Sequence, residues 1–78
     1  MCGLAKSIYD EEYRGLIRAL KDARKSAGLT QQDVADKLDR PQSFVAKVEG
    51  CERRLDVVEF LRLCRAIGIS PAAVLREA

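Results

Sequence analysis

The segment from residue 29 to residue 50 has the pattern of two short helices joined by a tight turn. Thr30 is a good N-cap residue because its hydroxyl oxygen can accept a hydrogen bond from a free amide at a helix start. Apolar residues then recur at the three- and four-residue spacing of one helix face: Val34, Ala35 and Leu38. We therefore expect a first helix from about residue 31 to residue 38, with one side covered by another element.

A second short helix is predicted directly after the first. Pro41 has no amide proton and a fixed φ, so it ends the first helix and suits the first turn of the next one. We expect this second helix to run from about residue 41 to residue 49. At about 100° per residue, Val45 and Val48 fall on the same side of it, and this side should be buried.

The outward side of the second helix carries side chains that can contact the edges of nucleic-acid bases. Ser43, Ala46 and Lys47 lie opposite the predicted buried side, and Gln42 and Phe44 flank them. Glutamine can bond adenine through two hydrogen bonds, lysine can reach guanine or phosphate, and alanine or an aromatic ring can touch a thymine methyl. A solvated helix face explains the same residues equally well from periodicity alone, and the spacing of the two helices favours the nucleic-acid interpretation.

Several short motifs of this chain have the spacing of a known family: Gly28-Leu-Thr-Gln, Val34-Ala35, Leu38, Gln42-Ser43, Val45, Val48-Glu49 and Ala66-Ile-Gly-Ile-Ser70. On these motifs the chain resembles the phage-repressor/Cro (Xre-type) helix-turn-helix DNA-binding family over about residues 10–77. The resemblance implies an all-α fold, a compact five-helix bundle of the repressor-like type with a central helix-turn-helix at about residues 31–49.

The function implied by the resemblance is sequence-specific binding of double-stranded DNA by a homodimeric transcriptional regulator. Such a regulator binds a palindromic operator and places its recognition helix, here about residues 41–49, in the major groove. The family's base-reading positions fall on Gln42, Ser43, Ala46 and Lys47, and its phosphate-binding positions fall on Gln31, Arg53 and Arg54. Arg24 and Glu49 match a structural ion pair of relatives, and the loss of one partner of such a pair is costly.

The chain departs from the family pattern at two positions where relatives commonly have glycine. Asp39 stands where the turn needs the left-handed conformation, which aspartate tolerates better than most residues, so we expect the turn to survive. Cys51 stands after the second helix, and we expect the preceding Gly50 to supply the flexibility instead.

The rest of the chain predicts three further helices and no strand. The predicted first helix spans about residues 10–27 and ends at Gly28; the fourth is capped by Asp56 and closed by Gly68; the last starts at Ser70-Pro71. We therefore expect one domain over residues 10–78, preceded by a flexible segment over residues 1–9.

Composition argues against several classes of protein. No apolar run approaches the roughly 20 residues that a membrane span needs, and no signal peptide is visible, so we expect a cytoplasmic protein without membrane contact.

The chain has no histidine, and its three cysteines form no C-x-x-C pair, which argues against a metal site and against a Ser-His or Cys-His nucleophile. Five small helices should also leave little room for a pocket of several hundred cubic ångströms. We therefore expect no enzyme activity, no cofactor and no small-molecule effector.

Two cysteines have different expected environments. Cys64 is in step with Phe60, Leu63 and Ile67 on the predicted fourth helix, so it should be a small core residue. Cys51 should be an exposed loop thiol, which is either a bystander or a redox sensor beside two arginines.

Two further interpretations stay open. The same fold serves protein-interaction or antitoxin-type modules, and an exposed apolar patch with Phe44 protruding from the outward face would favour that class. A controller protein of a restriction-modification locus or phage switch would share the DNA-binding mechanism. The usual dimer surface of the family and the apolar residues near the C-terminal end indicate four candidates for the dimer surface: Leu61, Ala72, Val74 and Leu75.

Overall fold

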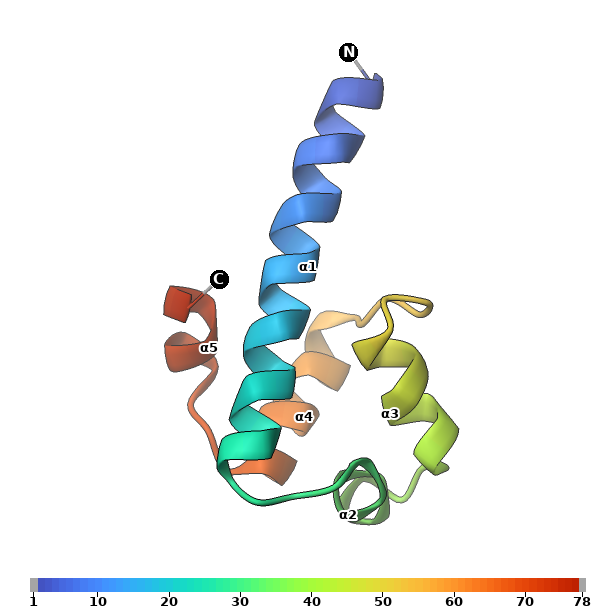
Figure 1. Cartoon of the computed structure of the whole chain (residues 1–78), viewed down its shortest axis with the longest axis vertical. Helices are drawn as coiled ribbons and strands as arrows, with labels where there is room; N and C mark the ends of the chain where they lie inside the picture. Colours follow the sequence, from blue (N-terminus) through green and yellow to red (C-terminus); the bar gives the residue numbers. More distant parts are fainter. Residues whose placement is uncertain (1, 78) are drawn as a thin grey trace.

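The computed structural model describes the backbone of residues 2–77 and the side chains of residues 11–76. This part of the chain contains five helices and no strand (Figure 1): α1 (Cys2–Ser26), α2 (Gln31–Leu38), α3 (Gln42–Glu49), α4 (Val57–Ile67) and α5 (Pro71–Glu77). The prediction of an all-α, five-helix fold is confirmed. No helix in the described range is both long and apolar enough to cross a membrane.

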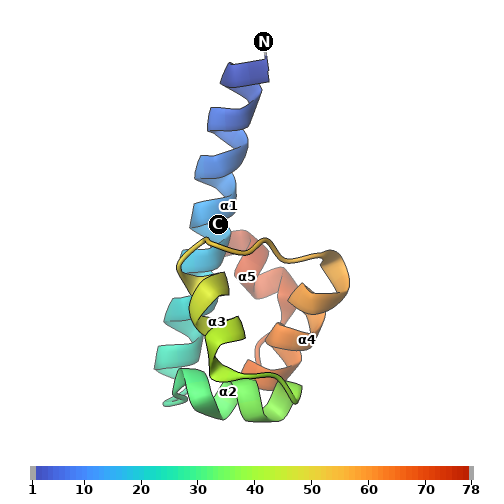
Figure 2. The ribbon, with the colours of Figure 1, turned by 90° about the vertical axis from the view of Figure 1, so that its right-hand side faces the viewer.

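The first helix is longer than the sequence predicts. It begins at Cys2 rather than near residue 10, and its first turns extend away from the other four helices (Figures 1 and 2). The predicted flexible segment over residues 1–9 falls where side chains lie outside the described residues, and it stays a prediction.

Local capping chemistry explains where α2 begins and ends. The Thr30 hydroxyl accepts a hydrogen bond from the Asp33 amide at 3.0 Å, and the Asp33 carboxylate accepts one from the Thr30 amide at 2.9 Å. This reciprocal pair satisfies two amides that a helix start leaves unpaired. Asp39 ends the helix in the left-handed conformation, with φ 57° and ψ 45°, so the turn survives without glycine as expected.

The same chemistry sets the limits of α4. Asp56 and Glu59 form a second reciprocal capping pair, and Gly68 ends the helix with φ 87°. α3 differs, because Pro41 occupies its N-cap position and makes no side-chain cap bond. The helix therefore starts at Gln42, one residue later than predicted.

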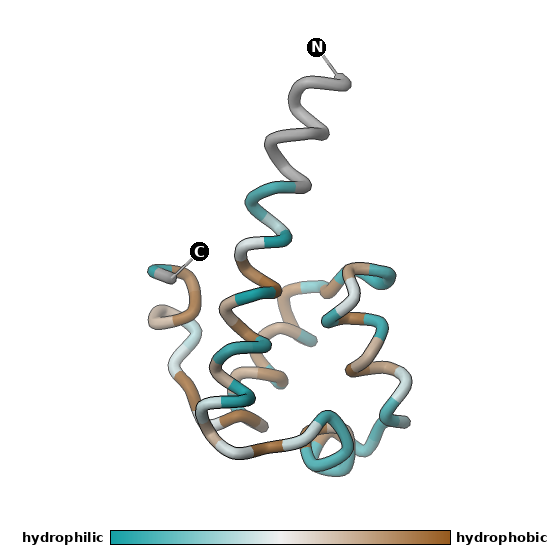
Figure 3. Tube along the Cα trace, viewed as in Figure 1, coloured by the Kyte–Doolittle hydropathy of each residue, from teal (hydrophilic) through white to brown (hydrophobic). Residues whose placement is uncertain are grey.

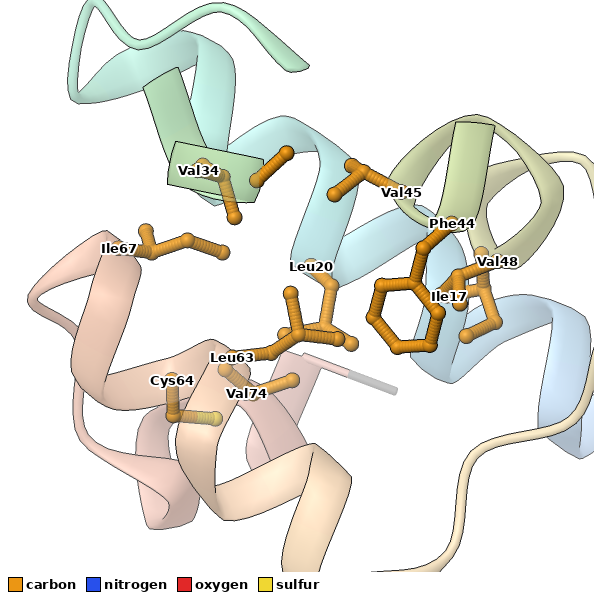
Figure 4. Packing of buried hydrophobic residues seen from close by; sticks show 11 residues of the cluster. Ile17, Leu20, Val34, Phe44, Val45, Val48, Leu63, Cys64, Ile67 and Val74 are labelled. Carbon is orange, nitrogen blue, oxygen red and sulfur yellow. The ribbon is translucent and has the colours of Figure 1, made fainter. Parts of the chain in front are cut away.

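All five helices contribute to one core (Figure 4). Its buried members are Ile17, Leu20, Val34, Ala35, Phe44, Val45, Val48, Leu63, Cys64, Ile67 and Val74. In the part of α1 from residue 11 to residue 26, hydrophobic and hydrophilic residues alternate, as expected for a helix with one covered side (Figure 3). Cys64 is a core residue, as predicted.

Two side chains that sequence placed at or near an exposed surface are buried. Phe44, whose protrusion from the outward face of α3 would favour a protein-interaction module, is only 7% exposed, and the guanidinium groups of Arg40 and Arg53 lie over its ring. Val74, a candidate for the dimer surface, is completely buried. Its position on the inner side of α5 explains why that short helix stays attached to α1.

The loop after α3 contains a strained residue. Gly50 has φ −85° and ψ 3°, which any residue can adopt, whereas Cys51 has φ 58°. The expectation that Gly50 supplies the flexibility is therefore wrong: the left-handed residue is Cys51 itself. A β-carbon in this conformation costs roughly 1–2 kcal/mol.

We expect Cys51→Gly to stabilise the domain. Relief of backbone strain outweighs the extra chain entropy that glycine loses on folding, which leaves a net gain of about 0.5–1 kcal/mol in the free energy of unfolding. Urea unfolding followed by circular dichroism measures this gain. Cys51→Ala is the matched control, because it removes the thiol and keeps the β-carbon; an equal gain in both variants would show that backbone strain is not the cause.

Candidate nucleic-acid interface

α2 and α3 form the predicted pair of short helices, joined through Asp39, Arg40 and Pro41. The Arg40 amide donates to the Ala35 carbonyl at 3.0 Å, and this bond closes the turn at the end of α2. Figure 2 shows α3 at the surface of the domain, with α2 below it and α4 beside it. The helix pair therefore presents one side of α3 to solvent.

The predicted base-reading residues lie on this exposed side of α3. Gln42, Ser43 and Lys47 are exposed, and Ala46 is half-buried. Val45 and Val48 are buried on the opposite side, as predicted. The side chains at the first, second and sixth positions of α3 can therefore be reached by a large partner.

A chain of hydrogen bonds holds Gln42 in place. Its amide nitrogen donates to the Gln31 side-chain oxygen at 2.6 Å, and the Gln31 amide nitrogen donates to Glu49 Oε1 at 2.9 Å. A glutamine amide has two N–H donors and an oxygen with two lone pairs. Gln42 therefore keeps one donor and its oxygen for a partner, and Gln31 keeps one donor.

Glu49 connects this chain of hydrogen bonds to the body of the domain. Arg24 Nε donates to Glu49 Oε2 at 2.6 Å, and Arg24 Nη2 donates to Glu49 Oε1 at 3.0 Å. The third nitrogen, Nη1, donates to the Leu29 carbonyl at 2.8 Å. Both side chains are only 9% exposed, so this two-bond ion pair joins α1, the start of the helix pair and the end of α3.

The charges of this ion pair are stable at neutral pH. Burial by itself would raise the pKa of Glu49, but hydrogen bonds from Arg24 and Gln31 outweigh it, so the pKa of Glu49 lies below its ordinary value. The hydrogen bond to Glu49 likewise raises the pKa of Arg24. The carboxylate therefore accepts three hydrogen bonds as an anion.

The predicted phosphate-binding arginines lie in the loop between α3 and α4. Arg53 makes a two-bond ion pair with Glu59, with both nitrogen–oxygen distances at 2.9 Å. The Arg54 guanidinium lies 4.6 Å from the centre of the Tyr13 ring. Tyr13 also fixes the loop backbone, because its hydroxyl accepts from the Leu55 amide at 3.0 Å and donates to the Arg53 carbonyl at 3.3 Å.

A second arginine contacts the same carboxylate. Arg40 Nη2 lies 3.3 Å from Glu59 Oε2, and the guanidinium groups of Arg40 and Arg53 lie 4.4 and 4.8 Å from the centre of the Phe44 ring. We call Arg40, Phe44, Arg53 and Glu59 the Phe44 cluster. Hydrogen bonds from Arg53, then from the Asp56 amide, lower the pKa of Glu59 to about 2.

Sequence reasoning missed three members of this interface: Tyr13, Arg40 and Glu59. Glu59 had a visible signal, because it stands three residues after the Asp56 cap in the spacing of a capping box. Tyr13 and Arg40 had none, since their contacts depend on how distant segments pack.

An apolar groove lies on another surface, between α1, α4 and α5. It has a volume of about 680 Å³ and is lined mainly by Tyr13, Leu16, Leu55, Val57, Leu61 and Leu75. The expectation that five small helices leave little room for a pocket of several hundred cubic ångströms is therefore wrong. We call this hollow the α4–α5 groove.

Comparisons with known proteins agree with this geometry. The model of a family described as "Helix-turn-helix domain" matches residues 16–77. A solved structure described as an XRE-family like protein from Pseudomonas syringae pv. tomato str. DC3000 superimposes with a TM-score of 0.90 at 49% sequence identity, over 94% of this chain and 89% of that one. The comparison with curated proteins finds no match.

The buried ion pair generates a prediction about stability. Glu49→Leu leaves Arg24 buried without its partner, and we expect a loss of about 3–5 kcal/mol in the free energy of unfolding. The double variant Arg24→Met/Glu49→Leu replaces both charges by apolar side chains, so it should lose much less. Urea unfolding measures both values, and a double variant that is no more stable than the single one would contradict this account.

The low pKa of Glu59 generates a prediction about pH. Because the folded-state pKa is about 2 and the ordinary value is 4.5, the contacts of ionised Glu59 stabilise the fold above pH 4.5. This contribution is lost as the pH falls from 4.5 toward 2. Urea unfolding of the natural chain and Glu59→Gln should therefore show a stability difference that shrinks across this window; a difference that is constant between pH 7 and pH 3 would contradict the assignment.

Proposed function

Because this chain belongs to the XRE-type family of helix-turn-helix proteins, we propose that it is a sequence-specific transcriptional regulator that binds double-stranded DNA as a homodimer. Family membership supports a DNA-binding regulator in general. The palindromic operator, the homodimer and insertion of α3 into the major groove belong to the proposal. A cytoplasmic location belongs to it as well.

The observation that carries the proposal is the fixed glutamine at the start of α3. Gln42 is exposed, yet Gln31 holds its amide at 2.6 Å and leaves one N–H and the oxygen unused. These are the two groups with which glutamine bonds the N7 and N6 positions of adenine. A side chain ordered before binding loses less conformational entropy on binding.

The remaining residues take the roles that their positions allow. Ser43, Ala46 and Lys47 contact base edges from the same side of α3, and Gln31 uses its unused N–H on a phosphate. Arg53 and Arg54 contact phosphates from the α3–α4 loop, whose backbone is fixed by Tyr13. Arg24 and Glu49 contribute structure, since they hold the end of α3 against α1.

An exposed apolar surface supports the homodimer. The large hydrophobic side chains exposed in the described range are Val57 (73%), Val58 (55%), Leu61 (37%) and Leu75 (59%). Val57, Leu61 and Leu75 also line the α4–α5 groove. One surface thus carries exposed apolar side chains beside a groove, and a two-fold dimer buries the same surface of both subunits. Two-fold symmetry would place the recognition helices about 34 Å apart on a palindrome.

The same apolar surface also favours a second candidate function. A protein-interaction or antitoxin-type module would use the α4–α5 groove for a different partner. The other feature that would have favoured this class, a protruding Phe44, is not present, since the ring is buried. Members of this family are typically not enzymes, and we assign no catalytic residue, cofactor or small-molecule effector.

Selection of bound sequences from a random pool of duplex DNA tests the proposed function. We expect recovery of a palindrome with half-sites about one helical turn apart, with binding that persists at the higher of two salt concentrations. Binding that is blind to sequence, or no binding, would favour the protein-partner alternative. Sedimentation of the free protein at several concentrations measures the dimer independently.

Lys47 provides a test of base reading. Lys47→Ala should weaken binding to the selected operator and, where Lys47 contacts a base, relax the preference at one position by about 1–3 kcal/mol. Competition assays with duplexes that differ at single positions measure this preference. Lys37→Ala is the matched control, because it removes one lysine charge from a side of α2 that lies near Arg62 and Arg65 of α4 and outside the proposed base-reading residues. An equal loss of affinity in both variants would exclude a base contact by Lys47.

A further inference from the structure

Glu59 binds two arginines that border the proposed DNA-binding side of α3. Its two carboxylate oxygens accept hydrogen bonds from the two terminal nitrogens of Arg53, each at 2.9 Å. The oxygen Oε2 also lies 3.3 Å from Arg40 Nη2. Arg40 directly precedes the Pro41 cap of α3, and Arg53 follows the end of the same helix. One carboxylate from α4 therefore holds a cation from each end of the recognition helix.

Both arginines can be reached from solvent, but Glu59 is covered. The side chains of Arg40 and Arg53 are 42% and 39% exposed, and that of Glu59 is 13% exposed. The two guanidinium groups rest on Phe44, which lies on the flank of α3 next to Lys47 in the helical repeat. A phosphate at the edge of the interface could therefore approach these arginines.

A carboxylate and a phosphate compete for the same arginine donors. Arginine binds either anion through a fork of two parallel N–H bonds. Glu59 already takes the two terminal nitrogens of Arg53, and one of these nitrogens also donates to the Arg54 carbonyl at 3.1 Å. Non-specific DNA binding depends almost entirely on phosphate contacts, whereas discrimination between sequences depends on base contacts.

We propose that Glu59 is a specificity-determining residue, which restrains Arg40 and Arg53 from phosphate contact unless α3 fits its operator. This inference rests on the proposed DNA-binding function. On a non-cognate duplex the arginines stay bound to Glu59 and add little affinity. On the operator, a phosphate replaces Glu59 as the partner of Arg53. Glu59 thereby increases the ratio of specific to non-specific affinity without touching a base.

The test compares the natural chain with Glu59→Gln on two duplexes, one of random sequence and one carrying the selected operator. Glutamine keeps the size of the side chain and the acceptor for the Asp56 amide, so the cap of α4 is retained. An arginine released from Glu59 can bind one additional phosphate, which makes binding more sensitive to salt. When salt is raised from 50 to 200 mM, the affinity of the variant for the random duplex should therefore fall about threefold more, per additional phosphate, than the affinity of the natural chain. The operator-to-random affinity ratio should decrease.

Glu52→Gln is the matched control for net charge. Glu52 is an exposed glutamate of the same α3–α4 loop, and the ion pairs found among the described side chains do not include it. This variant should leave the salt dependence of random-duplex binding close to that of the natural chain. Equal effects of the two variants would overturn the proposal, because the cause would then be the overall charge.

Arg53→Gln tests the same idea without a change at Glu59. If Glu59 restrains Arg53, this variant weakens operator binding and leaves the salt dependence on the random duplex nearly unchanged. A reduced salt dependence on the random duplex would show that Arg53 already contacts non-cognate phosphates, and it would overturn the proposal. Thermal unfolding of every variant establishes that binding is measured on folded protein.

The outcomes separate this proposal from the proposed function. A natural chain that binds neither random nor selected duplexes would refute the DNA-binding function itself. A natural chain that selects an operator, together with a Glu59→Gln variant whose salt dependence and affinity ratio are unchanged, would refute only the role of Glu59.

Discussion

The ion pair between Arg24 and Glu49 is the contact on which the exposed helix pair depends. It joins α1 to the last residue of α3 through two hydrogen bonds, and its third nitrogen holds the Leu29 carbonyl just before α2. Glu49 also accepts the Gln31 bond, which in turn positions Gln42. One buried charge pair thus sets the position of α3, the entry into α2 and the orientation of an exposed glutamine.

The opposite flank of α3 is held by a different kind of contact. In the Phe44 cluster, an aromatic ring from α3 is covered by two guanidinium groups, and a carboxylate from α4 binds both of them. Cation–π contact and ion pairing act here on the same two arginines. α3 is therefore fixed on one side by buried valines and the Arg24–Glu49 pair, and on the other by surface charges that a polyanion can influence.

The boundaries of α2 and α4 were predictable from sequence because capping is local, whereas the start of α1, which begins at Cys2, was not. Thr30, Asp56 and Gly68 signal a start or an end within three residues of themselves, and the structure places helix limits there. The burial of Phe44 was not predictable, because its ring is covered by Arg40 and Arg53, which approach it from two different loops. The bond between Gln31 and Gln42 was not predictable either, since each amide could equally face water. The assignment of Ser43, Ala46 and Lys47 to base edges stays a prediction, as it depends on a partner outside the chain.

The shortness of α2 and α3 ties their structure to the folding of the whole domain. Each has eight residues, below the roughly 12–15 at which an isolated helix becomes marginally stable in water. Their shape is therefore maintained by side chains from α1 and α4 rather than by their own backbone bonds. The α2–α3 segment is therefore not expected to keep its shape as an isolated peptide, and the fraction of chains with both helices formed equals the fraction of folded domains.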